Sequence, residues 1–275
     1  MRLGGAVVRA AVVRGVLIMM PAASILATCG SGFAWGPEGH KAIAILAERY
    51  MRPEAKAEVR KLLGPESIED AAVWADQIRQ SGRPETAPWH FINIPLRDSK
   101  IDLRRDCPGG RCVLVKTQEF LAVLGDARAP AAPRREALKF VIHFVADLHQ
   151  PLHCEDHRDL GGNRLRVMFE GRPDNLHSVW DTGLVQEINS DPQQLAAELA
   201  REITGQERAF WQAGDVSAWV LESHRLAQTA AYRRIWIFGP PVLTRGYDDR
   251  ARAVIKLQLE KAAVRLAYLL DHRLN

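Results

Sequence analysis

Histidines and aspartates recur in this chain at spacings that suit metal coordination. His143 and Asp147 are four residues apart, as are His177 and Asp181, so on a helix each pair would place an imidazole and a carboxylate on one face. Together these groups suit zinc in catalytic sites, where an open coordination position holds water. The same residue types recur at His40, Asp76, His90 and His153. The series predicts a cluster of several metal ions.

The apolar setting of the first pair strengthens this prediction. His143 and Asp147 lie within the apolar run 140–148, where a lone histidine is more often a hydrogen-bonded core residue. An aspartate one turn below it would be a buried charge that needs compensation, and a bound cation provides it. Asp76 and His90 carry no such signal when each is taken alone. Spacing gives no partner to the remaining histidines, which we assign to surface or core: His149, His157, His224 and His272.

The first 34 residues have the features of an export signal. Three arginines give a positive start, and the apolar run 15–27 is too short to span a membrane. The small-x-small pattern Gly32-Phe33-Ala34 predicts cleavage before Trp35. Lipoprotein processing at Cys29 is an alternative. We therefore expect a secreted or periplasmic protein without a membrane span.

Removing this signal changes the charge of the chain. There are 37 Lys and Arg residues against 33 Asp and Glu, and the signal holds three of the arginines and no acid. The mature protein is therefore nearly neutral, with one excess positive charge. This excludes the broad basic surface of proteins that bind polyanions through charge alone. Affinity for an anionic substrate would have to come from metal ions and a few local arginines.

Helical patterning dominates the rest of the chain. Apolar stripes and flanking prolines and glycines predict helices that position the histidines and aspartates. The predicted helices cover 39–50, 53–63, a segment that starts at Ser67, a segment from Pro133 through Leu148, and later 192–212, 215–236 and 248–272.

Strand signals are few. Alternating apolar residues over 165–169, after Gly161-Gly162, predict a short β-hairpin, and residues 91–94 before Pro95 form a second extended candidate. No linker, repeat or low-complexity block interrupts residues 35–275. We therefore expect a mainly α protein with one compact multi-helix domain, in preference to two.

Two of the cysteines are placed to form a local disulfide. Cys107 and Cys112 flank the turn Pro108-Gly109-Gly110, and in an oxidising compartment we expect a local disulfide between them. Cys154, next to His153, is then unpaired. It is either a plain buried thiol or a redox-sensitive one beside the metal cluster.

The ordered blocks of this chain resemble the fungal and plant single-strand-specific zinc nucleases, a family that shares a superfamily with zinc-dependent phospholipase C. The resemblance covers about residues 35–185, and the rest of the chain is similar only in being helical. The matching blocks are Trp35-Gly36-x3-His40, Trp74-Ala75-Asp76, His90-Phe91-Ile92, His143-Phe144-x2-Asp147-x2-Gln150-Pro151-Leu152-His153, Gly161-Gly162-Asn163 and Asp174-Asn175-Leu176-His177-Ser178-x-Trp180-Asp181.

The resemblance implies three zinc ions. The implied ligand sets are Asp76, His90, His143 and Asp147 for the first zinc; His153, His177 and Asp181 for the second; and the amine and carbonyl of Trp35 with His40 and Asp147 for the third. Asp76 would also hold the attacking water. From its sequence position alone, Trp35 could equally be an aromatic anchor at the start of the mature chain.

The resemblance also implies contacts with a substrate. Phe91 and Leu160 would sandwich a base, a contact that tolerates any sequence. Asn93 replaces an aspartate that bonds a base edge in the fungal enzymes, so base preference does not carry over. Asn163 either touches the site or serves the glycine turn before it. Arg79, one turn after Asp76, either reaches a phosphate oxygen or is a solvated helix charge.

The function that the resemblance implies is hydrolysis of RNA and single-stranded DNA to 5′-nucleotides, together with removal of 3′-phosphates from nucleotides, by a monomer. Zinc-activated water and paired metal ions suit phosphodiester cleavage. A phospholipase C that acts on lipid headgroups is an alternative, but Phe91 and the block at 174–181 favour a nuclease. A non-catalytic zinc-binding protein is a third possibility. The presence of Asp76 argues against it, because storage needs no carboxylate to position water.

Overall fold

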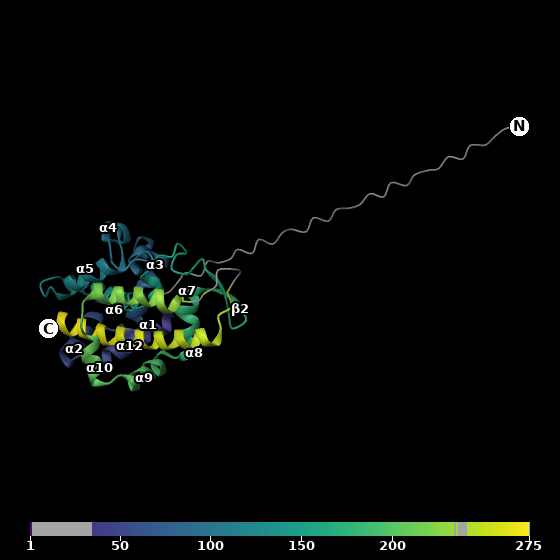
Figure 1. Ribbon diagram of the computed structural model, residues 1–275. Helices are drawn as coiled ribbons and strands as arrows, with labels where there is room; N and C mark the ends of the chain where they lie inside the picture. The colour runs from purple at the N-terminus through teal and green to yellow at the C-terminus, as the bar shows by residue number, and fades with distance from the viewer. Residues whose placement is uncertain (2–34, 234, 236–240, 275) are drawn as a thin grey trace. The chain divides into compact units, whose positions relative to one another are not determined.

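The computed structural model describes residues 1, 35–233, 235 and 241–274. The chain divides into two units, Met1–Gly30 and Ser31–Asn275, and every element below belongs to the second (Figure 1). Apart from Met1, the predicted export signal, including Cys29, lies outside the described residues. Among the described helices, none combines the length and the apolar character that a membrane crossing requires.

Helices make up most of the described chain, and the mainly α prediction is confirmed. The α-helices are α1 (Gly36–Tyr50), α2 (Pro53–Leu63), α3 (Ile68–Ser81), α4 (Leu103–Asp106), α5 (Val113–Gly125), α6 (Ala131–Asp147), α7 (Leu176–Ser178), α8 (Leu184–Ile188), α9 (Pro192–Glu202), α10 (Gly205–Trp211), α11 (Val216–Leu226) and α12 (Arg245–Arg273). Shorter 3₁₀ segments are η1 (Pro84–His90), η2 (Pro108–Gly110) and η3 (Pro151–His153), and two π-helical turns are η4 (Val179–Gly183) and η5 (Ala227–Ala231).

The predicted β-hairpin is also present. Strands β1 (Arg166–Phe169) and β2 (Arg172–Asn175) pair antiparallel, with Arg166 opposite Asn175. Its turn contains Gly171 at φ 75°. The other extended candidate, residues 91–94, forms no named strand. It runs beside the end of η3 and the residues that follow, where Ile92 N–H donates to His153 O at 2.8 Å and Asp156 N–H donates to Ile94 O at 2.7 Å.

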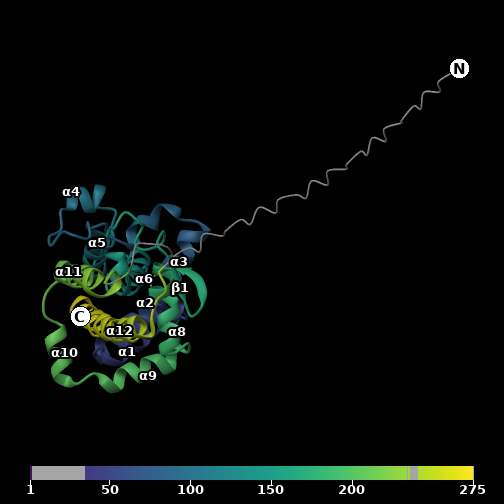
Figure 2. The same cartoon turned by 45° about the vertical axis from the view of Figure 1, so that its right-hand side comes forward.

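Helix α6 lies at the centre of the described unit. Its residues from Ala137 to Asp147 are buried on every side, as expected for a helix enclosed by others. It packs against α3, α5 and α12, and α12 also packs along α1. Figures 1 and 2 both show the long α12, in yellow, running beside α1. This packing places His143 and Asp147 in the interior, so the metal ligands predicted on α6 cannot be surface charges.

The helix boundaries correct two predictions. The segment 192–212 is two helices, because Thr204 caps α10 and forms a capping box with Glu207. The segment 215–236 is α-helical only to Leu226 and continues as the π-helical turn η5. Helix α5 has no counterpart among the predicted helices. The other predicted helices are found within a few residues of their expected positions.

The cysteine predictions hold where the structure tests them. Cys107 and Cys112 form a disulfide, with their Cα atoms 5.3 Å apart. Cys154 is a free, fully buried thiol whose Sγ donates to Leu148 O at 3.4 Å. Burial raises the pKa of the Cys154 thiol well above its ordinary value, which disfavours the reactive thiolate. These features support the plain buried thiol over the redox-sensitive alternative.

Candidate metal centre

Helices and turns from across the described chain bring the eight predicted histidine and aspartate ligands into one buried region. Each of these side chains belongs to a residue at most 6% exposed, so any charge they carry is removed from water. They come from α1 (His40), α3 (Asp76), η1 (His90), α6 (His143 and Asp147), η3 (His153), α7 (His177) and η4 (Asp181).

The ligand atoms gather in three groups. Within each group, one atom from every member lies within 4.8 Å of the others, close enough to bind a shared ion. The groups are His40, His143 and Asp147; Asp76, His90 and His143; and His153, His177 and Asp181. His143 therefore links the first two groups.

Backbone carbonyls fix the orientation of three histidine rings. Nδ1 of His143 donates to Ala72 O at 2.7 Å, Nδ1 of His153 to His90 O at 2.8 Å, and Nδ1 of His177 to Gly161 O at 2.6 Å. A carbonyl can only accept, so each Nδ1 carries a hydrogen, and Nε2 is the nitrogen that offers a lone pair to a metal ion when the ring is neutral. Such outer hydrogen bonds are typical of metal-binding histidines.

His153 gives the clearest sign of a metal-binding side chain. Its Nε2 is buried and has no hydrogen-bond partner among the described residues. Burial lowers the pKa of His153 to about 3, so at neutral pH the ring is neutral and able to bind a metal ion. A buried acceptor without a partner costs free energy, and a metal ion would remove this cost. The residues of this group therefore fit a metal ion.

The histidines and aspartates around α6 also fit a metal ion. Nδ1 of His90 lies 3.0 Å from both His143 Nε2 and Asp147 Oδ2. Burial lowers the pKa of His90 well below its ordinary value, so its ring is also neutral at neutral pH. Asp76 lies beside this group, with Oδ1 3.7 Å from His90 Nδ1. Imidazole and carboxylate donors packed this closely suit a borderline ion such as zinc.

Trp35 occupies the start of α1 and is fully buried. Its indole Nε1 donates to Ala146 O at 2.9 Å, and its carbonyl accepts from Gly39 N–H at 3.0 Å. The first contact is what an aromatic anchor would make. Metal binding through the amine and carbonyl of Trp35 stays a prediction.

Gly161 supports the ring of His177. Its φ is 62°, and an added Cβ would lie 2.6 Å from Leu152 O. Only glycine can adopt this positive φ and approach Leu152 O this closely without strain. The chain can therefore pass close to η3 and present the Gly161 carbonyl to His177.

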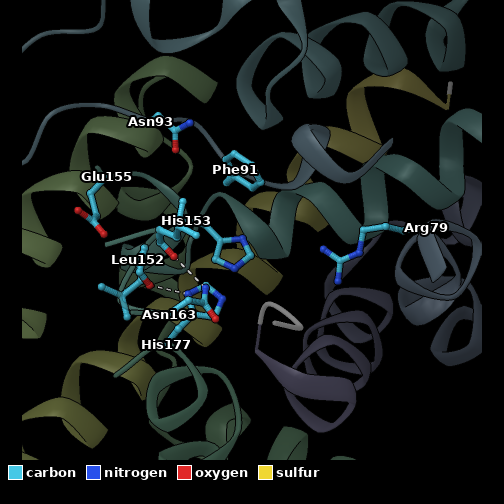
Figure 3. Close-up of a pocket in the computed structure, with 10 residues that line it drawn as sticks. Arg79, Phe91, Asn93, Leu152, His153, Glu155, Asn163 and His177 are labelled. Atoms are coloured by element: carbon cyan, nitrogen blue, oxygen red, sulfur yellow. Dashed lines mark hydrogen bonds between the residues drawn. The ribbon is translucent and has the colours of Figure 1, made fainter. Parts of the chain in front are cut away.

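A cavity of about 310 Å³ opens beside the metal groups (Figure 3). His153 and His177 belong both to its wall and to a metal group, so a molecule in the cavity would lie next to bound ions. All the residues predicted to contact a substrate line it, as does Arg79. The complete lining is Arg79, Phe91, Asn93, Leu152, His153, Glu155, Leu160, Gly161, Asn163 and His177.

The structure gives detail to each of these predictions. Arg79 is mostly buried, with Nη2 2.8 Å from Asp76 Oδ1, so it is not a solvated helix charge. Leu160 is 61% exposed at the rim of the cavity. Asn163 both lines the cavity and serves the turn, since its Nδ2 donates to Leu160 O at 2.8 Å. Asn93 is exposed on the cavity wall.

Glu155 also lines the cavity, although it is not among the predicted site residues. It is 2% exposed, and its Oε1 forms a hydrogen bond with the Tyr232 hydroxyl at 2.8 Å. Burial raises the pKa of Glu155 to about 8. Its position two residues after His153 is the only signal in the sequence, because Tyr232 is distant along the chain.

Comparison with known proteins finds relatives that are nucleases. The family described as S1/P1 Nuclease matches residues 35–275. Nuclease P1 of Penicillium citrinum is 30% identical over 262 residues, which cover 85% of this chain and 95% of that protein. Nuclease S1 of Aspergillus oryzae is 31% identical over 172 residues, covering 60% of this chain and 59% of that protein. Endonuclease 3 of Arabidopsis thaliana is 33% identical over 211 residues, covering 71% and 69%.

The family match spans every residue of the three histidine and aspartate groups and the adjoining cavity. The chain belongs to the S1/P1 nuclease family.

Proposed function

We propose that this enzyme hydrolyses RNA and single-stranded DNA to 5′-nucleotides at the buried histidine and aspartate groups, and that it also removes 3′-phosphates from nucleotides. The observation that carries the proposal is the shared position of His153 and His177, which belong to a metal group and to the cavity wall. A nucleotide in the cavity would have its phosphate beside the metal groups and its base among Phe91 and its neighbours.

We assign three zinc ions to this centre, with the ligand sets that the resemblance implies. The unpartnered His153 Nε2 and the buried carboxylates support this assignment. When bound, zinc would lower the pKa of water toward neutrality and offset the charge of the phosphate oxygens. Three divalent ions against three ligand aspartates would leave a positive surplus, which attracts an anion to a nearly neutral protein.

Three side chains of the protein have further roles in the proposed reaction. Asp76 is buried and can accept a hydrogen bond from the attacking water, which holds the water in line with the scissile bond. Arg79 already contacts Asp76, and its guanidinium fork suits a phosphate oxygen. Phe91, partly exposed on the cavity wall, offers a face on which a base can stack.

The recessed cavity favours unpaired strands. A base can enter it only after leaving its stack, and in a duplex this step costs free energy of pairing and stacking. In a single strand the bases are free to splay out and stack on aromatic side chains. The proposed preference for single strands follows from this difference.

We further propose that residues 1–34 are removed and that the mature monomer is secreted or periplasmic. The disulfide between Cys107 and Cys112 supports an oxidising compartment. The family match starts at Trp35, the first residue of the predicted mature chain. Cleavage there would free the amine that the third zinc requires.

The direct test compares two substrates with the purified mature enzyme. Incubation with single-stranded DNA or RNA should release acid-soluble nucleotides that carry 5′-phosphates, whereas phosphatidylcholine vesicles should release no phosphocholine. Release of phosphocholine alone would overturn the nuclease assignment in favour of a phospholipase C. Products with 3′-phosphates would overturn the proposed direction of cleavage.

A further inference from the structure

Glu155 places a buried carboxyl group in the wall of the cavity. In Figure 3, Glu155 and Arg79 are drawn on opposite sides of the cavity, with His153 between them. If Arg79 and the metal groups hold the phosphate, Glu155 lies where the far end of a nucleotide would be. That end is the base.

One oxygen of this carboxyl group already has a hydrogen-bond partner. The Tyr232 hydroxyl lies 2.8 Å from Glu155 Oε1 and 2.9 Å from Asp159 Oδ1. The Tyr232 hydroxyl has one hydrogen to donate, and when it donates that hydrogen to Asp159 it can accept one from the protonated Oε1 of Glu155. The position of Oε1 is then fixed, and Oε2 is left as an acceptor.

The other oxygen is buried and unused. Glu155 Oε2 has no hydrogen-bond partner among the described residues, although the residue is 2% exposed. Leaving a buried acceptor unsatisfied costs free energy that a ligand donor would recover. A ligand in this cavity should therefore present an N–H or O–H group to Oε2.

The nearby amides narrow the choice of ligand. The Asn163 amide is already bonded to Leu160 O at 2.8 Å, whereas Asn93 is exposed on the cavity wall and offers both a donor and an acceptor. Guanine presents two adjacent N–H donors on its pairing edge, next to the O6 acceptor. Adenine and cytosine each present one amino group beside a ring acceptor. Uracil and thymine present a single N–H between two carbonyls, and the carbonyl oxygens would repel the acceptor oxygen of the carboxyl group.

We propose that Glu155 determines base preference: Oε2 accepts N–H donors from the pairing edge of a guanine stacked on Phe91, while the Asn93 amide donates to O6. The enzyme would then cleave next to guanine faster than next to thymine or uracil. This inference rests on the proposed nuclease function and adds to it a preferred substrate.

The test uses oligothymidylates that carry a single dG, dA, dC or dT at one central position. The initial rate of cutting at that position is divided by the rate at the flanking dT positions of the same strand. Because both rates come from one enzyme sample, the ratio does not depend on the fraction of active protein. We expect a ratio of about ten for dG in the wild type, the size of discrimination that one good base contact gives.

Glu155→Gln should lower the dG ratio to about one, because the amide can turn its NH₂ group toward the base and then faces two N–H donors. Cutting at dT should continue, since the metal groups are untouched. Asp156→Asn is the matched control. Asp156 is the adjacent acid but does not line this cavity, so its amide variant should keep the wild-type ratio.

A second variant separates the carboxyl group from its anchor. Tyr232→Phe keeps Glu155 but removes the hydroxyl that holds Oε1, so the dG ratio should fall part of the way. If Glu155→Gln does not fold, as judged by circular dichroism, this variant decides the question, and an unchanged ratio in it overturns the proposal.

The outcomes separate this inference from the function on which it depends. A wild type that cuts all four strands with equal ratios, or a folded Glu155→Gln that keeps the dG ratio, overturns the role of Glu155 and leaves the nuclease function standing. A wild type that cuts none of the strands overturns the nuclease function itself.

Discussion

The orientation of each histidine ring decides which of its nitrogens can bind a metal ion. In His143, His153 and His177 a backbone carbonyl binds Nδ1 and leaves Nε2 to face the centre. These carbonyls belong to Ala72, His90 and Gly161, which lie in other parts of the chain. The ligands are therefore oriented before a metal ion arrives, and binding costs little ordering entropy.

At the level of single residues, Asp76→Asn should lower kcat for single-stranded DNA by about a hundredfold or more. The amide keeps the shape of the side chain but loses the charge that would bind a metal ion and orient water. Initial rates of acid-soluble release would measure the change. Glu69→Gln, on the same helix but facing Gln193 of α9, should stay within about twofold of the wild type. Turnover that survives unchanged in Asp76→Asn would remove the proposed role.

The sequence predicts the ligands better than it predicts the cavity wall. Two His-x3-Asp pairs in apolar segments carry a signal of their own, and the resemblance supplies His40, Asp76, His90 and His153. The contact between Glu155 and Tyr232 joins residues 77 positions apart, and no local spacing rule connects them. Pairing of this kind depends on how η5 packs beside η3, which only the folded chain specifies.

Among the elements, the glycine turn between η3 and β1 tolerates the fewest residue types, because its backbone conformation and close contacts require glycine. Gly161→Ala should lower the free energy of unfolding by about 2–3 kcal/mol, because it combines a strained φ with a clash against Leu152 O. It should also weaken zinc binding, since the Gly161 carbonyl orients His177. Urea unfolding and zinc titration would measure the two effects.

Gly171→Ala provides the matched control. Gly171 has φ 75°, similar to Gly161, but an added Cβ would meet no atom within 4 Å. It should cost about 1 kcal/mol from backbone strain alone and leave zinc binding unchanged. Equal losses in the two variants would show that the close approach to Leu152 is unimportant.

Helices with a clear apolar stripe are predictable from the sequence, and helix ends are less so. α2 begins and ends where the prolines and the glycine around it indicate. The break before α10 is set by the Thr204 capping box, while the apolar pattern continues through it. Helix α5 carries apolar residues on more than one face because it packs against both α6 and α11, so it shows no single stripe.

At the level of the whole molecule, one buried acid outside the metal centre should make stability depend on pH. Burial, and then the charge of Glu202, raise the pKa of Glu260 in α12 to about 7 from an ordinary 4.5. Its Oε1 has no hydrogen-bond partner among the described residues. Between these two pH values the folded state holds a proton that the unfolded state has lost. The free energy of unfolding therefore falls as the pH rises from about 4.5 through 7.

Glu260→Gln should prevent this fall in the free energy of unfolding at high pH, because the amide does not ionise. Relative to the wild type, the variant should gain about 1–2 kcal/mol in the free energy of unfolding at pH 8 and much less at pH 4.5. Urea unfolding at both pH values measures the difference, and release of metal ions at low pH cancels because both proteins carry the same site. Glu54→Gln, an exposed acid on α2, should show no such pH dependence. Equal gains at both pH values would contradict the burial of a charged Glu260.

The whole account depends on metal ions bound by the buried histidines and aspartates. Elemental analysis of the purified mature enzyme, paired with activity on single-stranded DNA before and after chelation, tests this most directly. We predict three zinc ions per chain, loss of activity when they are removed, and recovery when zinc is returned. Fewer than two zinc ions in fully active enzyme, or undiminished cleavage after complete chelation, would contradict it.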